Sequence, residues 1–133
     1  MKQNMGHLIY IVDDDPEDRE FLGEAFSHHN KTVQCIMFEN GAKLLAQLYS
    51  KGENLPGIIL LDLNMPGISG RHVLQELKSN ASLKHIPILI FTTSHLAADK
   101  RTAYELGANC FLTKPSSHNR LLELAKSILN LWF

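Results

Sequence analysis

The sequence has no strong excess of charge of either sign. Its 133 residues carry 13 Lys and Arg against 14 Asp and Glu, which gives a formal net charge of −1. A chain with so little net charge has no overall electrostatic attraction to nucleic acid or to an anionic membrane surface. We therefore expect neither nucleic acid nor a membrane among its partners.

Cysteines and long apolar runs are also scarce. Only two cysteines are present, Cys35 and Cys110, and they lack CxxC spacing, so a disulfide framework is excluded. Both lie in apolar runs, where a free Cys usually packs as a small hydrophobe. No run is long enough to span a bilayer, and the polar residues 1–7 do not have the apolar stretch of a signal peptide. We therefore expect a cytoplasmic protein.

Short apolar runs alternate with amphipathic segments along the whole chain. The runs that favour strands are Leu8–Val12, Thr32–Phe38, Ile58–Leu61, Ile86–Phe91 and Cys110–Leu112. Most are apolar without interruption, as in strands covered on both faces, whereas Thr32–Phe38 is mixed and suits an edge. Alternation of this kind predicts an α/β fold, with five parallel strands in the order 2-1-3-4-5 and helices on both faces. A single domain fills residues 1–133, with its core at about 7–131.

Five helices are predicted from apolar residues at helical spacing. Asp15 and Pro16 mark the start of the first helix, Gly107 the end of the fourth, and Ser116 or Ser117 the start of the last. The apolar positions are Phe21, Leu22, Ala25 and Phe26, then Leu44, Leu45 and Leu48, then Val73, Leu74 and Leu77, then Ala103 and Leu106, and finally Leu121, Leu124, Ala125, Ile128 and Leu131.

The last helix has apolar residues outside its predicted core stripe. These residues are Leu122, Leu129, Trp132 and Phe133. An apolar helix with more than one apolar face needs something to cover it. Two explanations remain open, a chain end that folds back onto its own domain and a homodimer or partner surface at the C-terminal helix.

Polar residues follow four of the five predicted strands. Asp13 and Asp14 follow the first strand, Asp62 the third, Thr92 ends the fourth, and Lys114 follows the fifth. The carboxyl ends of parallel strands meet at one edge of the sheet, where ligands bind. Carboxylates gathered there repel one another unless a cation joins them, and Mg²⁺ prefers such oxygen ligands. With a hydroxyl and an ammonium nearby, the set can support phosphoryl transfer onto a carboxylate, which predicts Asp62 as the acceptor.

Each of these residues alone has an ordinary explanation. Asp15 is accounted for as a helix cap, Asp13 and Asp14 as a solvated turn, and Lys114 as a surface lysine. Their joint occurrence at the correct strand ends is what supports the prediction.

Together these motifs resemble the receiver domain of two-component response regulators, from Leu8 to about Phe133. The motifs are Ile11-Val12-Asp13-Asp14, Leu60-Leu61-Asp62-Leu63-Asn64-Met65-Pro66, Gly70, Thr92 and Lys114-Pro115. The resemblance implies a flavodoxin-like (CheY-like) three-layer sandwich. It also implies a signalling switch and not an enzyme, since such a domain catalyses only its own phosphorylation and dephosphorylation. It implies a sensor histidine kinase or phosphotransfer protein as donor and a downstream protein target or a phosphate relay. No output domain is expected.

A narrower resemblance concerns the small regulators that serve bacterial phytochromes. It rests on Phe91-Thr92-Thr93-Ser94, on residues 107–115 and on Trp132-Phe133.

The family's site roles carry over to the matching residues. Asp62 resembles the phosphorylated aspartate. The metal ligands for Mg²⁺ would be Asp14 directly, Asp13 through water, Asp62 itself and the backbone carbonyl of Asn64. Thr92 would hydrogen-bond one phosphoryl oxygen and Lys114 would pair with another.

The remaining roles are structural or concern switching. The family usually has a cis peptide at the position of Lys114–Pro115, an isomer that costs little before proline, and Gly70 belongs to its pattern of motifs. Phe111 falls at the aromatic switch position that works with Thr92, and the alternative is a permanently buried Phe on a central strand. Asn64 and Ser94 are at positions that influence the lifetime of the phosphoryl group, and their small size predicts minutes rather than days.

Three other functions compete with this one. A phosphohydrolase of the haloacid dehalogenase type would need a DxD motif ending in Thr or Val after the first strand, which Asp13-Asp14-Asp15-Pro16-Glu17 lacks. A flavin-binding electron carrier would need a phosphate cradle there, and three aspartates repel phosphate. A binding module that is never phosphorylated stays open.

Overall fold

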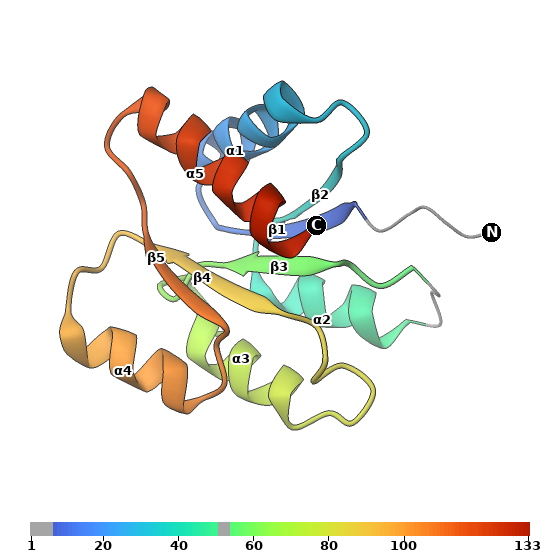
Figure 1. Cartoon of the computed structure of the whole chain (residues 1–133). Helices are drawn as coiled ribbons and strands as arrows, with labels where there is room; N and C mark the ends of the chain where they lie inside the picture. Colours follow the sequence, from blue (N-terminus) through green and yellow to red (C-terminus); the bar gives the residue numbers. More distant parts are fainter. Residues whose placement is uncertain (1–6, 51–53) are drawn as a thin grey trace.

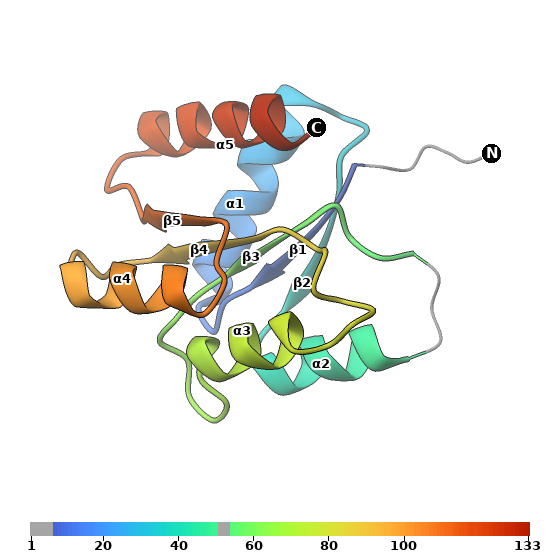
Figure 2. The same ribbon diagram turned by 60° about the horizontal axis from the view of Figure 1, so that its bottom comes forward.

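A parallel sheet covered by helices on both faces forms the protein. The computed structural model describes residues 7–50 and 54–133, and within them five parallel strands follow the order β2-β1-β3-β4-β5. Helices α1 and α5 cover one face, and α2, α3 and α4 cover the other (Figure 1; Figure 2). The predicted α/β fold and strand order are confirmed. The elements are β1 Leu8–Val12, α1 Pro16–His29, β2 Gln34–Phe38, α2 Gly41–Tyr49, β3 Ile58–Leu61, α3 Gly70–Lys78, β4 Ile88–Thr92, α4 Ala97–Glu105, β5 Cys110–Thr113 and α5 His118–Trp132.

Burial along the strands follows their place in the sheet. Every residue of β1, β3 and β4 is buried, whereas most residues of the outer strands β2 and β5 are partly or fully exposed. The edge position predicted for the mixed second run is therefore confirmed. Strand β4 begins two residues later than predicted, at Ile88, since Pro87 has no N–H to donate to the ladder. Strand β2 begins at Gln34 because the side chain of Asn30 accepts the Thr32 N–H in a turn.

Alternate residues of the strands point to opposite faces of the sheet and pack in two apolar cores, one on each side. Ile9 and Ile11 of β1 face α1 and α5, and pack with Leu22, Phe26 and Ile128. The intervening residues face α2, α3 and α4. That second core includes Tyr10, Val12, Leu44, Leu74 and Ala103. Because both faces of β1, β3 and β4 are covered, the strand ends are the free part of the sheet, and polar side chains gather there.

The predicted helix boundaries are met by capping contacts. Asp15 accepts hydrogen bonds from the N–H groups of Glu17 and Asp18, with Pro16 as the first helical residue. Ser117 caps α5 through the Arg120 N–H. Gly107 follows α4 at a φ of 107°, where a side chain would be strained.

Helix α5 packs the predicted residues Leu121, Leu124, Ala125 and Ile128 against the core, but its last predicted core residue is wrong. Leu131 was expected in the core and is 78% exposed, so that prediction is wrong. Leu122, Leu129 and Trp132 were expected outside it and instead pack, half-buried, against the core on the α1 side. The buried stripe runs through Ala125 and Ile128 toward position 132, and residue 131 is turned about 100° away from that position along the helix.

Membrane-spanning helices are absent from the described residues. No helix within 7–50 and 54–133 has both the length and the apolar character that crossing a bilayer demands.

Candidate phosphorylation and metal site

The polar residues that follow the strands meet at one edge of the sheet. Asp13 and Asp14 follow β1, Asp62 follows β3, Thr92 ends β4, and Lys114 follows β5 by one residue. Oxygens from Asp13, Asp14 and Asp62 lie within 4.8 Å of one another. The structure thus brings together three carboxylates that are far apart in the sequence.

Asp13 is held in place from two directions. Its side chain is almost fully buried, and its Oδ1 accepts a hydrogen bond of 3.0 Å from the Asp15 N–H. Arg19 on α1 donates from Nη1 to the Asp13 carbonyl at 2.7 Å. Burial raises the pKa of Asp13 above its ordinary value, although the Lys114 ammonium and the Asp15 N–H act in the opposite direction. Because burial makes the charged form of this carboxylate unfavourable, a cation beside it is stabilising.

Asp62 lies at the centre of the site and is only 6% exposed. Its Oδ1 accepts a hydrogen bond of 3.2 Å from the Asn64 N–H, and its Oδ2 lies 3.3 Å from Lys114 Nζ. The backbone at Asp62 is fixed by Gly70, the first residue of α3. A Cβ on Gly70 would lie 2.2 Å from the Asp62 carbonyl oxygen, so α3 can start this close to the acceptor loop only with glycine.

Lys114 is shared by three carboxylates. Its Nζ lies 2.7 Å from Asp13 Oδ2, 2.8 Å from Asp18 Oδ2 and 3.3 Å from Asp62 Oδ2. The ammonium also lies 5.7 Å from the centre of the Phe91 ring. Burial lowers the pKa of Lys114, but the carboxylates outweigh burial and the pKa stands above its ordinary value. Lys114 is therefore a permanent cation in the site.

The peptide bond between Lys114 and Pro115 is trans. The described residues contain no cis peptide bond, so the expected cis isomer is wrong for this structure. The trans form is the intrinsic preference before proline by about 0.5–1 kcal/mol. Lys114 Nζ reaches its three carboxylates with this trans peptide.

Thr92 and Phe111 occupy the region predicted to switch. Thr92 is fully buried, and its Oγ1 accepts a weak hydrogen bond of 3.4 Å from the Ser94 N–H. Phe111 is half-buried and lies on β5, which is an edge strand and not the central strand of the alternative explanation. Its backbone N–H donates to the Tyr104 hydroxyl on α4 at 3.0 Å.

Two features of the site were not anticipated from the sequence. Asp18, in the first turn of α1, contacts Lys114 more closely than Asp62 does. In addition, Asp99 accepts hydrogen bonds from the Ser94 hydroxyl at 2.6 Å and from Arg71 at 2.8 Å, which ties the β4–α4 loop to α3. The sequence signal for Asp18 was its spacing of four residues before Leu22, which places a carboxylate on the core-facing side of α1.

The acidic cluster fits a divalent cation. Asp13 Oδ2 is buried and has no partner at hydrogen-bonding angles in the described structure, although Lys114 Nζ is close. Unsatisfied buried carboxylate oxygens beside two further carboxylates are suitable ligands for a hard cation. Asp13, Asp14 and Asp62 are the side chains placed close enough together to hold such an ion.

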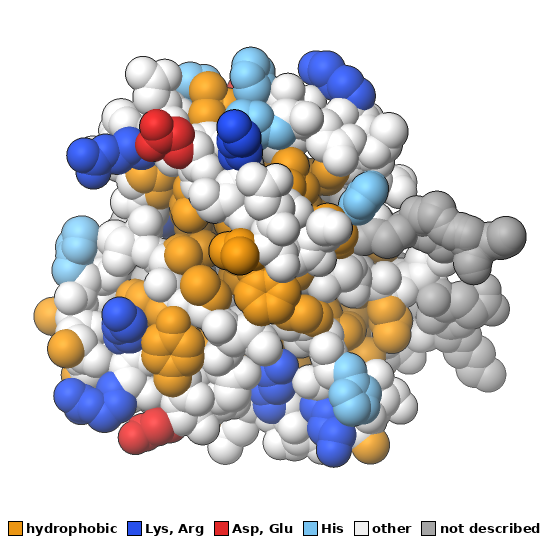
Figure 3. All heavy atoms as spheres, viewed as in Figure 1, with side chains coloured by type: hydrophobic (Ala, Val, Ile, Leu, Met, Phe, Trp, Pro, Cys, Tyr) orange, Lys and Arg blue, Asp and Glu red, His pale blue; other side chains and the backbone are white. Residues whose placement is uncertain are grey.

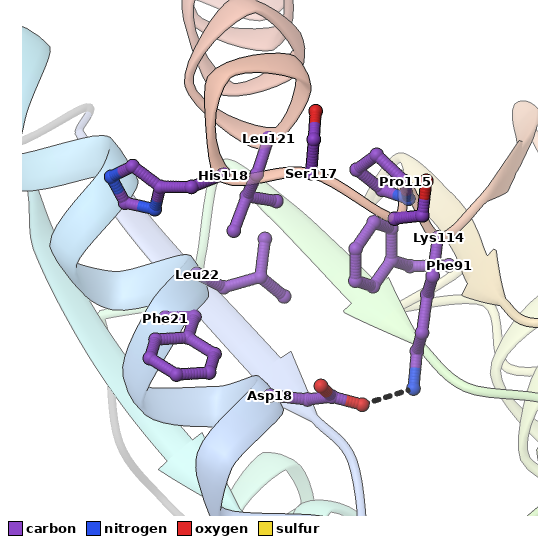
Figure 4. Close-up of a pocket in the computed structure, with 10 residues that line it drawn as sticks. Asp18, Phe21, Leu22, Phe91, Lys114, Pro115, Ser117, His118 and Leu121 are labelled. Atoms are coloured by element: carbon purple, nitrogen blue, oxygen red, sulfur yellow. Dashed lines mark hydrogen bonds and ion pairs between the residues drawn. The ribbon is translucent and has the colours of Figure 1, made fainter.

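A cavity opens beside Lys114, between α1 and the start of α5 (Figure 4). Its volume is about 420 Å³. Its apolar wall is formed by Phe21, Leu22, Phe91 and Leu121. Asp18 and Lys114 lie at one end of it, where they are joined by an ion pair. The cavity thus adjoins the site at Lys114.

Comparisons with known proteins agree with this geometry. The family model described as "Response regulator receiver domain" matches residues 9–126. The chain belongs to the response regulator receiver domains. The response regulator Rcp1 of Synechocystis is 35% identical, over 98% of this chain and 92% of its own. PilH of Pseudomonas aeruginosa is 31% identical, over 91% and 96%.

Solved structures of receiver domains superpose closely on this one. A phosphorylated cyanobacterial phytochrome response regulator, RcpA, has a TM-score of 0.87 at 33% identity, with coverage of 95% of this chain and 93% of its own. The Mn²⁺-bound form of Rcp1 has a TM-score of 0.84 at 35% identity, with coverage of 95% and 94%. The predicted resemblance to receiver domains, and to phytochrome regulators among them, is confirmed.

Membership in the receiver family decides between the competing functions. The protein is a receiver of the phospho-acceptor signalling class, a family of switches, and its homologues imply interaction with histidine kinases and downstream targets. The phosphohydrolase and flavin-carrier alternatives are thereby set aside. The unphosphorylated binding module remains an alternative, because it shares the same fold and family.

Proposed function

We propose that Asp62 accepts a phosphoryl group from a sensor histidine kinase or a phosphotransfer protein, with Mg²⁺ held by Asp13, Asp14, Asp62 and the Asn64 carbonyl. The observation that carries the proposal is the meeting of three carboxylates and the Lys114 ammonium at the end of β1, β3 and β5. A nearly buried carboxylate beside a fixed cation is suited to accept a phosphoryl group and to retain it.

The reaction moves one phosphoryl group between two protein side chains. A carboxylate oxygen of Asp62 forms a bond to phosphorus as the bond between phosphorus and the donor histidine nitrogen breaks. The electron pair stays on that nitrogen, which gains a proton from water. Lys114 exchanges its contact with Asp62 Oδ2 for a phosphoryl oxygen, and the Thr92 hydroxyl donates to another. When bound, Mg²⁺ supplies positive charge to the phosphoryl oxygens.

The switch between signalling states begins with the rotation of the Thr92 hydroxyl toward the phosphoryl group. Thr92 Oγ1 has only a weak hydrogen bond in this structure, so little opposes its rotation toward a phosphoryl oxygen. Phe111 is half-buried on β5, the strand beside β4, and we propose that its ring turns inward when Thr92 moves. We propose that the face formed by α4, β5 and α5 carries the signal to a downstream protein or receives the donor in a relay.

The donor protein approaches along the cavity between α1 and α5. Phe21 lines this cavity and is 45% exposed, and Lys114, another lining residue, has its Nζ 3.3 Å from Asp62 Oδ2. An exposed aromatic beside a reactive group is a suitable anchor for a partner helix. We place the whole exchange in the cytoplasm, where the two unpaired cysteines remain reduced.

Intact mass tests the proposal directly. The wild type, Asp62→Asn and the control Glu17→Gln are incubated with acetyl phosphate and Mg²⁺, with and without EDTA. We expect one phosphoryl adduct on the wild type and the control, and none on Asp62→Asn or with EDTA. An adduct that survives Asp62→Asn would reject Asp62 as the acceptor. If no variant is modified, even with cognate kinase, the unphosphorylated binding module becomes the better explanation.

We also propose that a second copy of the chain covers the α4-β5-α5 face. Hydrophobic side chains gather there (Figure 3), and the exposed apolar residues of these elements include Tyr104 and Leu131. The surface does not depend on Leu112, Leu122, Leu129 and Trp132, which pack, partly buried, against the core of their own domain.

Analytical ultracentrifugation measures the fraction of the protein that forms the proposed homodimer. Leu131→Ser is expected to weaken dimerisation of the phosphorylated protein, whereas Leu55→Ser, at an exposed leucine outside this face, is expected to leave it unchanged. Equal dimerisation by the two variants would argue for another surface.

A further inference from the structure

Lys114 competes with a divalent cation for the same carboxylate oxygens. Its Nζ lies 2.7 Å from Asp13 Oδ2 and 3.3 Å from Asp62 Oδ2, and both carboxylates belong to the candidate metal cluster. Mg²⁺ requires its oxygen ligands in nearly ideal octahedral geometry and repels a neighbouring ammonium. Lys114 must therefore give up at least one of these contacts when the cation binds.

Asp18 offers Lys114 a contact outside the metal cluster. It lies on α1, one turn after the acidic loop, and its Oδ2 is 2.8 Å from Lys114 Nζ. Figure 4 shows the two side chains pointing toward each other at one end of the cavity. In the described structure Lys114 is the sole polar partner of the Asp18 carboxylate, so nothing else competes for it.

The neighbouring charged residues of α1 have other tasks. Asp15 caps the helix through the N–H groups of Glu17 and Asp18. Arg19 donates to the Asp13 carbonyl. Glu17 precedes Asp18 on the same exposed turn and has no side-chain contact with Lys114. Asp18 is thus the residue of this turn that is placed to act on Lys114.

We propose that Asp18 is a positioning residue that holds Lys114 beside the site while a divalent cation takes Asp13 and Asp62. The inference rests on the proposed function, since it assumes the metal site described above. Without Asp18, the ammonium divides its contacts between Asp13 and Asp62 alone and competes more strongly with the cation. The Asp18–Lys114 pair is partly exposed, so removal of the carboxylate is expected to weaken cation binding by about two- to fivefold.

Calorimetric titration with Mg²⁺ alone tests the inference without any phosphodonor. The variants are Asp18→Asn, Asp18→Glu, the control Glu17→Gln, Lys114→Met, and Lys114→Met combined with Asp18→Asn. We expect Asp18→Asn to raise the dissociation constant about two- to fivefold, Asp18→Glu to restore it, and Glu17→Gln to leave it nearly unchanged. Lys114→Met is expected to bind Mg²⁺ more tightly than the wild type, because the competing ammonium is gone.

The double variant separates positioning from simple loss of charge. If Asp18 acts through Lys114, Asp18→Asn has little effect once Lys114→Met is present. An Asp18→Asn effect that equals that of Glu17→Gln, or that persists in full without Lys114, would overturn the inference and leave the proposed function intact. Failure of the wild type to bind Mg²⁺ would instead overturn the proposed metal site, and the inference with it.

Discussion

Gly70→Ala is the substitution whose effect the structure defines most sharply. A Cβ at this position would lie 2.2 Å from the Asp62 carbonyl oxygen and 2.6 Å from Leu63 Cα. Both are backbone atoms, so no side-chain rotation relieves the clash, and ordinary contact needs a displacement of about 1 Å. Either α3 moves away from the sheet or the acceptor loop moves with Asp62.

The expected loss in the free energy of unfolding follows from the cost of overpacking a buried position, which is typically about 1–3 kcal/mol. Unfolding entropy is about 2.1 cal/mol/K per residue, or about 0.28 kcal/mol/K for a chain of 133 residues. A loss of about 2 kcal/mol in the free energy of unfolding therefore lowers Tm by about 7 °C. Displacement of Asp62 by about 1 Å is expected to slow phosphorylation by acetyl phosphate on the order of tenfold to a hundredfold.

Gly67→Ala provides the matched control in the same loop. Gly67 has a φ of 77°, and no atom lies within 4 Å of the place that a Cβ would occupy, so alanine there introduces backbone strain without a clash. We expect a loss of stability of about 1–2 kcal/mol with phosphorylation near the wild-type rate. Urea unfolding followed by circular dichroism gives the stability, and intact mass gives the rate. A Gly70→Ala protein that is phosphorylated as fast as Gly67→Ala would refute the argument that Gly70 sets the position of Asp62.

Three further predictions concern other parts of the structure. The pKa of Lys114 stands above its unfolded value of 10.5, so the stability it contributes is fully present below about pH 10.5 and is lost as pH rises through the folded pKa. The urea-measured difference between the wild type and Lys114→Met is thus expected to shrink in that alkaline range, and a difference independent of pH would contradict it. Burial raises the pKa of Cys35 from 9.0 to about 11, so at pH 8 its thiolate fraction is about a hundredfold lower than normal. Iodoacetamide should modify Cys35 far more slowly in the folded than in the unfolded protein, as measured by peptide mapping. Equal rates would contradict the raised pKa of this thiol. Asp99→Asn is expected to shorten the lifetime of the phosphoryl group about two- to fivefold, because it releases Ser94 and loosens the β4–α4 loop. The decay of the phosphorylated species in intact-mass spectra measures this lifetime. An unchanged lifetime would show that the β4–α4 loop does not control hydrolysis of the phosphoryl group.

The strand-end residues could be predicted because parallel strands impose a simple geometry. Once Asp62 and Lys114 were each placed after a strand, their meeting at one sheet edge followed from the topology, and the structure shows them 3.3 Å apart. Asp18 could not be found in this way, since it follows no strand and comes to the site through the packing of α1. Its contact with Lys114 depends on the angle of that helix, which periodicity does not determine.

The errors at α5 have a related cause. Leu131 and Trp132 are adjacent and both apolar, so the sequence pattern does not say which of them faces the domain. The position of α5 over α1 decides the matter, and it half-buries Trp132 and leaves Leu131 exposed. The cis peptide before Pro115 was inferred from resemblance alone, and the residues themselves contained no signal for it.

The hydrogen bond from the Phe111 N–H to the Tyr104 hydroxyl gives the protein a native reporter. This N–H belongs to the outer strand β5, and its partner comes from α4 and not from another strand. Its amide proton is therefore exchanged with solvent deuterium whenever α4 separates from β5, even if the sheet stays intact. The exchange rate of this single amide measures how often α4 separates from β5, before and after treatment with a phosphodonor, without any label or partner protein.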